Sequence, residues 1–103
     1  MTEFVFASRL EDVIEGQMLA LNIDDVPMAL TRIEGRIVAF RDVCTHDDGP
    51  LAEGEIDAGC VVCPRHGARF DLLTGKATFP APAPLLMYET RIQNGEVQVK
   101  LEE

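Results

Sequence analysis

The sequence contains no tryptophan, only three cysteines, and half as many basic as acidic side chains. Because it also has one Tyr and five Phe, a core must rest mainly on Val, Ile, Leu and Met. Three cysteines are an odd number without the spacing of a secreted disulfide framework, which favours metal binding in a reducing cytoplasm. The formal net charge of −9 opposes binding to nucleic acid or to an anionic membrane.

Long hydrophobic runs are absent too. No stretch approaches the roughly eighteen apolar residues of a membrane span, and the first residues do not have the pattern of a signal peptide. We therefore expect a soluble, untargeted, cytoplasmic protein. Its 103 residues suit one domain and leave little room for a separate catalytic module.

Short runs of β-branched, aromatic or alternating apolar residues predict an all-β chain. The predicted strands are 4–7, 18–23, 28–33, 37–43, 60–63, 86–92 and 97–101. Turn residues lie between neighbouring runs, and Asn94-Gly95 is typical of a type I′ hairpin. Residues 10–14 predict at most a helical turn, and Pro80 to Pro84 predict a stiff extended loop.

Two short segments each offer one thiolate and one imidazole. They are Cys44-Thr-His46 and Cys63-Pro-Arg-His66, and they contain the only two histidines of the chain. The ligands of the first segment are too close in sequence to share a helical face, and Pro64 takes the second segment out of a strand. We therefore expect two loops that converge on one metal site.

The second segment continues as His66-Gly-Ala-Arg-Phe-Asp71, then Thr74-Gly75 and the proline segment. Together with the Cys and His pairs, this run resembles the small Rieske [2Fe–2S] ferredoxins of aromatic-ring dioxygenase systems. The resemblance implies a single Rieske domain over residues 1–103. Its fold would be an antiparallel, sandwich-like base from residues 1–42 and 84–103, with a cluster-binding subdomain at about 43–83.

The resemblance also implies the roles of the four ligands. Cys44 and Cys63 would bind the inner iron of one [2Fe–2S] cluster per chain, and His46 and His66 the outer iron through Nδ1. The proline loop would shield the cluster. The protein would carry single electrons from a flavin-dependent reductase to a terminal (di)oxygenase, without being a catalyst itself.

Two departures from the high-potential Rieske proteins predict a low reduction potential. Those proteins have an additional Cys in each ligand segment, where this sequence has Gly49 and Arg65. They also have Ser and Tyr hydroxyls that donate to sulfur, where this sequence has Ala68 and Phe70. Fewer donors stabilise the reduced cluster less, so we expect a potential near the low end of the Rieske range.

Other functions remain open on the sequence alone. The chain could be an accessory protein of nitrite reduction or of iron–sulfur assembly, or a structural zinc module with the same four ligands. A Rieske oxygenase needs a further iron site with two His, which this chain cannot supply. Cys60 and Cys63 form a Cys-x-x-Cys pattern that a zinc or thiol redox site would also show, but we expect Cys60 to be a buried core residue. Arg65 and Arg69 flank His66; we expect them to be solvated, and a contribution to the potential or to docking stays open.

Overall fold

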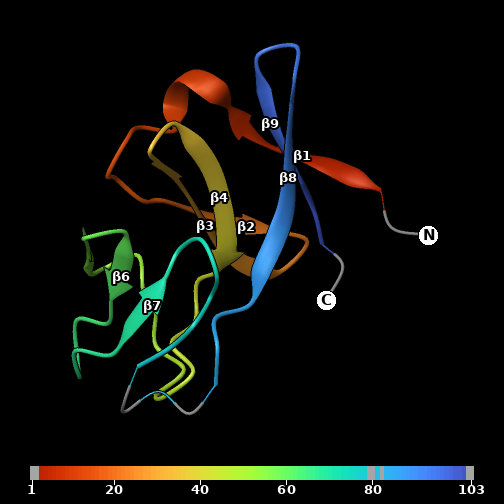
Figure 1. Ribbon diagram of the computed structural model, residues 1–103. Coiled ribbons are helices and arrows are strands. Elements are labelled where there is room, and N and C mark those ends of the chain that lie inside the picture. Colours follow the sequence, from red (N-terminus) through yellow and green to blue (C-terminus); the bar gives the residue numbers. More distant parts are fainter. Residues whose placement is uncertain (1–2, 79–80, 82, 102–103) are drawn as a thin grey trace.

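The computed structural model describes residues 3–78, 81 and 83–101, and all nine strands lie in antiparallel sheets (Figure 1). The strands are β1 (Phe4–Arg9), β2 (Leu19–Ile23), β3 (Val26–Ile33), β4 (Arg36–Arg41), β5 (Glu55–Asp57), β6 (Cys60–Val62), β7 (Arg69–Asp71), β8 (Met87–Gln93) and β9 (Glu96–Lys100). The one helical element described is a single 3₁₀ turn, η1 (Leu10–Asp12), which confirms that prediction. No helix within the described ranges is long and apolar enough to cross a membrane.

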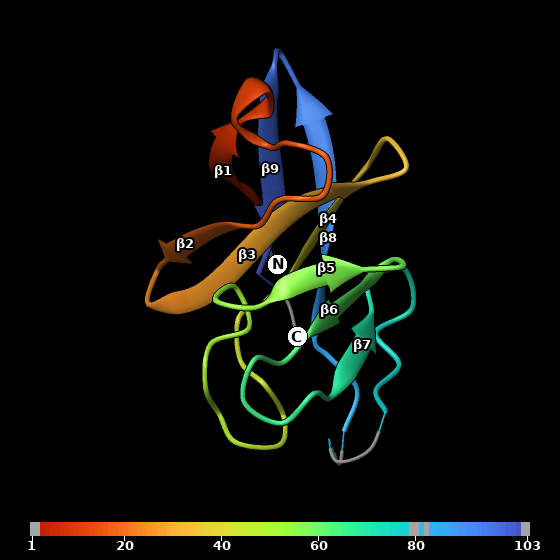
Figure 2. The ribbon, with the colours of Figure 1, turned by 90° about the vertical axis from the view of Figure 1, so that its left-hand side faces the viewer.

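Six strands form the larger sheet, in the order β1-β9-β8-β4-β3-β2, and three form the smaller, in the order β5-β6-β7 (Figure 2). Strand β1 pairs with β9, so both ends of the chain contribute to the larger sheet. The smaller sheet comes wholly from the segment between β4 and β8. The predicted all-β, antiparallel architecture is therefore confirmed.

Tight two-residue turns set the register of the hairpins. Asn94 and Gly95 both have positive φ, as the type I′ prediction requires, and so do Glu34 and Gly35. A further turn of this kind joins β5 to β6 at Ala58 and Gly59. Sequence analysis missed that turn, because Ala is an uncommon residue at positive φ.

The sequence prediction also missed two strands, β5 and β7. Each has three residues, too few for a periodic pattern, and each is held by pairing with β6. The predicted strand 37–43 was too long, since β4 ends at Arg41. Pro80 and Pro82 of the predicted proline loop lie outside the described residues.

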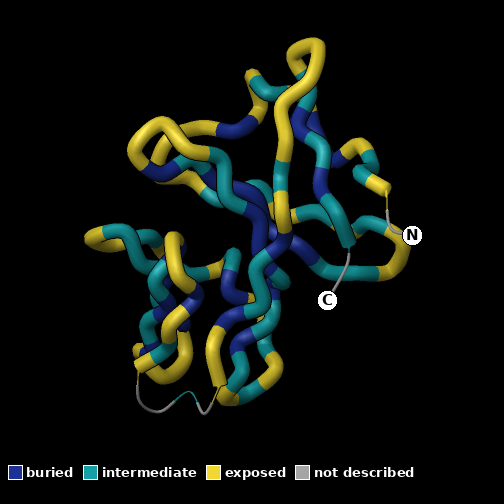
Figure 3. Tube along the Cα trace, turned by 45° about the vertical axis from the view of Figure 1, so that its right-hand side comes forward, coloured by how far each residue is buried: buried dark blue, intermediate teal, exposed yellow. Residues whose placement is uncertain are grey.

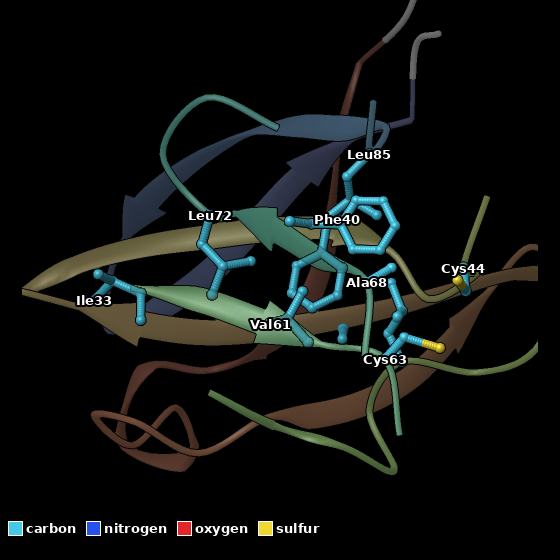
Figure 4. Packing of buried hydrophobic residues seen from close by; sticks show 11 residues of the cluster. Ile33, Phe40, Cys44, Val61, Cys63, Ala68, Leu72 and Leu85 are labelled. Carbon is cyan, nitrogen blue, oxygen red and sulfur yellow. The ribbon is translucent and has the colours of Figure 1, made fainter. Parts of the chain in front are cut away.

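Strand β3 separates two apolar cores because its alternate side chains point to opposite faces. Met28 and Leu30 pack in one core with the β8–β9 hairpin, whereas Ala29 and Ile33 pack in the other with the smaller sheet. Both faces of the strand are thus covered, and the buried segments run through the centre of the molecule (Figure 3). The second core joins the two sheets (Figure 4).

Phe40 is one of two fully buried phenylalanines in the core between the sheets, with 0% exposure. We expect Phe40→Ala to lower the free energy of unfolding by about 3–5 kcal/mol, through lost burial and the cavity left behind. Ile92→Ala is the control, because Ile92 is 55% exposed and should change stability by less than about 0.5 kcal/mol. Denaturant titration of both variants measures this, and equal effects would contradict the assignment of the core.

Candidate metal centre

The two cysteines of the predicted site lie at the same end of the core between the sheets (Figure 4). Cys44 follows β4 of the larger sheet, and Cys63 directly follows β6 of the smaller sheet. Their exposures are 0% and 1%. The packing of one sheet on the other therefore brings the two thiols together in an apolar environment.

The two loops share one backbone pattern, counted from each cysteine. The N–H of Cys44 donates to Gly49 O at 2.8 Å, and the N–H of Cys63 donates to Ala68 O at 2.8 Å, five residues on in both cases. The carbonyl of each cysteine accepts from the residue four positions later, Asp48 or Gly67, and both of these residues have positive φ. Each loop is thus closed independently, with its ligands facing the other loop.

Closing the loops directs backbone N–H groups at the sulfurs. Burial raises the pKa of the Cys44 thiol above its usual value, despite the N–H groups of His46 and Asp47. Burial acts on Cys63 in the same direction, but there the N–H groups of Arg65 and His66, together with the Cys44 thiol and the charge of Arg65, outweigh it, and the pKa is lowered. The second loop therefore favours the thiolate of Cys63, the form that binds metal, whereas burial favours the neutral thiol at Cys44.

The two histidines meet beside the thiols. Their Nδ1 atoms lie 3.2 Å apart, and the rings are nearly perpendicular, with centroids 4.4 Å apart. Two nitrogens at this separation can each lie about 2 Å from a shared metal ion, the usual metal–imidazole distance. All four predicted residues are thus brought to one place, and two sulfur with two nitrogen donors suit an iron–sulfur cluster or zinc.

Asp47 is a member of the site that sequence analysis missed. Its carboxylate lies within 4.8 Å of the donor atoms of Cys44 and Cys63, and also within 4.8 Å of those of His46 and His66. The Arg65 guanidinium, together with the N–H of Gly49, holds the pKa of this carboxyl well below its usual range. The sequence did contain a signal for this contact, because Asp47 lies directly after His46 and the oppositely charged Arg65 lies directly before His66.

The expectation that Cys60 is buried was wrong, because Cys60 is partly exposed. Arg65 and Arg69 remain accessible to solvent, and each also forms an ion pair, with Asp47 and Asp57 respectively. A sequence cannot show which acidic side chain a folded loop will place opposite an arginine.

Asp42 anchors the first loop to the larger sheet. This buried carboxylate accepts the N–H groups of Leu51 and Ala52, both at 2.7 Å, where the chain leaves the loop. We expect Asp42→Ala to leave both donors unsatisfied and to lower the free energy of unfolding by about 1–3 kcal/mol. Hydrogen exchange should accelerate at these two amides first, and unchanged exchange there would contradict the anchoring role.

Comparison with known proteins agrees with this geometry. Residues 3–94 match the Rieske [2Fe-2S] domain family. The chain is 38% identical over 102 residues to the 3-phenylpropionate/cinnamic acid dioxygenase ferredoxin subunit of Escherichia coli (strain K12), covering 96% of this chain and 94% of that protein. It is 32% identical over 100 residues to the ferredoxin component of the naphthalene 1,2-dioxygenase system of Pseudomonas putida, with 96% of both chains covered.

Among solved structures, the fold is similar to that of a chain in the complex of reduced oxygenase and oxidized ferredoxin in carbazole 1,9a-dioxygenase. The TM-score is 0.84 at 31% identity, and the match covers 92% of this chain and 99% of that chain. The family match over residues 3–94, the relatives and the fold agree, and the chain belongs to the Rieske [2Fe-2S] domain family.

Proposed function

We propose that this protein is a one-electron carrier that holds one Rieske [2Fe–2S] cluster per chain and transfers electrons to a terminal oxygenase. The observation that carries the proposal is the Nδ1 to Nδ1 separation of 3.2 Å between His46 and His66, beside two buried thiols. The relatives named above are ferredoxin components, which agrees with a carrier rather than a catalyst.

In this proposal Cys44 and Cys63 bind the inner iron, and His46 and His66 bind the outer iron through Nδ1. Burial supports this order, since the cysteines are fully buried and both histidines are exposed. When bound, the cluster supplies a centre that accepts and releases one electron at a time. Two thiolates and two neutral imidazoles add two fewer negative charges than four thiolates, so the protein's own ligands favour reduction.

The chain's residues then act by holding the centre still and near the surface. Backbone N–H groups directed at both sulfurs offset negative charge. The Thr45 hydroxyl donates to Ala83 O at 2.7 Å, which ties the first ligand loop to the described part of the proline segment. The exposed histidine edges would offer a short path to a partner, with no need for a substrate pocket.

Relatives support the choice of partner. A flavin-dependent reductase as donor and an oxygenase as acceptor fit the dioxygenase systems named for the Escherichia coli and Pseudomonas putida proteins, and the carbazole system supplies a ferredoxin seen together with its oxygenase. These names favour the dioxygenase role over nitrite reduction or iron–sulfur assembly. We further propose a cytoplasmic location and a single domain over residues 1–103, with a cluster-binding subdomain at about 43–83.

Electron paramagnetic resonance of the dithionite-reduced protein, with iron quantified per chain, tests the cluster. We expect about two irons per chain and a rhombic signal with the lowered mean g value of a histidine-ligated cluster. His46→Ala and His66→Ala should abolish the signal, because each removes one ligand of the outer iron. Cys60→Ser is the control and should retain it, whereas zinc without iron in the wild-type protein would contradict the proposal.

A redox titration tests the expected low potential. Ala68 and Phe70 are fully buried and have no side-chain group that donates a hydrogen bond. We expect the midpoint near the lower end of the range from about −150 to +300 mV that Rieske centres span. Ala68→Ser adds a hydroxyl in the second ligand loop and should raise the midpoint, while a wild-type value well above zero would contradict the prediction.

A further inference from the structure

The two ligand loops are connected by a compact group of polar contacts that the proposed ligand set does not include. Nε of Arg65 donates to Oδ2 of Asp47 at 2.5 Å, and Nη2 of Arg65 donates to Oδ1 of Asp47 at 3.2 Å. Nη1 of Arg65 donates to the carbonyl oxygen of Pro50 at 3.0 Å. The side chain of Arg65, in the second loop, thus binds the first loop at the side chain of Asp47 and at the backbone of Pro50.

We infer that this Arg65–Asp47 clamp locks the two ligand loops in register and slows loss of the cluster, which makes Arg65 and Asp47 positioning residues of the metal centre. The inference rests on the proposed cluster and its ligands. Each clamp residue lies directly beside a ligand in sequence, since Asp47 follows His46 and Arg65 precedes His66. Movement of the clamp would therefore move both imidazoles.

The form of the contact suits a structural link better than an ordinary surface ion pair. The Asp47 side chain is 18% exposed and that of Arg65 31%, so water screens the pair only partly. The guanidinium engages both carboxylate oxygens, the geometry in which Arg–carboxylate pairs are strongest. Asp47 is itself fixed, because its Oδ1 accepts the N–H of Gly49 at 3.0 Å.

The absence of a side chain at Gly49 leaves the space in which the Arg65 guanidinium lies. A Cβ at Gly49 would lie 2.5 Å from Cζ of Arg65, closer than such contacts occur, and Gly49 does not have the positive φ that would otherwise require glycine. The missing side chain is therefore space that Arg65 occupies. Gly49→Ala should expel the guanidinium without straining the backbone, and it provides a test that leaves both charges in place.

The opposite charges of the clamp give it a signature that a purely structural contact lacks. Reduction adds negative charge to the cluster, so nearby positive charge raises the potential and nearby negative charge lowers it. Removing Arg65 leaves Asp47 uncompensated and should lower the potential, whereas neutralising Asp47 should raise it. Both changes break the same clamp and should accelerate cluster loss.

The experiment compares Arg65→Gln, Arg65→Lys, Asp47→Asn, Gly49→Ala and the double variant Asp47→Asn/Arg65→Gln with the wild-type holoprotein. Loss of the visible cluster absorbance is followed anaerobically in the presence of an iron chelator, and the midpoint potential is titrated. We expect each single variant that breaks the Arg65–Asp47 clamp to lose its cluster roughly five- to tenfold faster than the wild-type protein. The double variant should be no faster than the singles, with its potential returning toward wild type.

Arg65→Lys separates charge from geometry, because Lys keeps the positive charge but cannot form the two-pronged contact. It should retain a potential close to wild type while losing its cluster faster. Arg69→Gln is the matched control. It removes one positive charge from an ion pair with Asp57 that does not connect the ligand loops, and it should leave the loss rate unchanged.

Two results would overturn the clamp. One is a loss rate in Arg65→Gln and Gly49→Ala equal to that of Arg69→Gln. The other is an altered paramagnetic signal in Asp47→Asn alone, which would make Asp47 a metal ligand, in keeping with its 3.2 Å contact to Nδ1 of His66.

If the protein binds no Rieske cluster, the wild-type protein will lack the paramagnetic signal, and this result is separate from the tests of the clamp. That result would overturn the proposed function and the claim about cluster loss together. Hydrogen exchange at the Gly49 and Gly67 amides still reads the link between the loops in that case. Faster exchange in Arg65→Gln than in Arg69→Gln would show that the two loops are locked, and equal exchange would refute it.

Discussion

The packing of the small sheet on one face of the large sheet is the interaction on which the proposed metal centre depends. Cys44 follows a strand of the large sheet and Cys63 a strand of the small one, so neither sheet alone holds both thiols. Phe40, Val61 and Phe70, all fully buried, belong to the core that joins the sheets. Burial of apolar area at this junction thus stabilises the fold and sets the separation of the ligands.

A second constraint is the control of charge inside that junction. Thiolates in an apolar environment are costly unless polar groups face them, and each loop provides two backbone N–H groups for its own sulfur. The closure shared by the two loops explains how short segments achieve this without a large number of side chains. Because the donors are main-chain groups, this control of charge comes from the backbone of the loops, whereas Arg65 contributes through its side chain.

The same arrangement explains how a small protein can serve as an electron carrier. Electron transfer requires a centre that changes little in geometry, a surface near it and a transient partner, and weak redox encounters bury less than about 1,200 Å². In the proposed ligand set, the buried cysteines would hold the centre and the exposed histidines would bring it to the surface. The excess of acidic side chains over the whole chain adds a field that would favour basic docking surfaces on a reductase or oxygenase.

Local sequence was enough to predict the all-β class, the hairpin at Asn94-Gly95 and the four candidate ligands that the fold brings together. These features are local, because turn chemistry and ligand spacing are written in consecutive residues. The strands β5 and β7, the partly exposed position of Cys60 and the pairing of Asp47 with Arg65 depend instead on contacts between distant segments. Three-residue strands exist only through pairing with a neighbour, and an ion pair between residues 18 positions apart depends on how two loops meet in space.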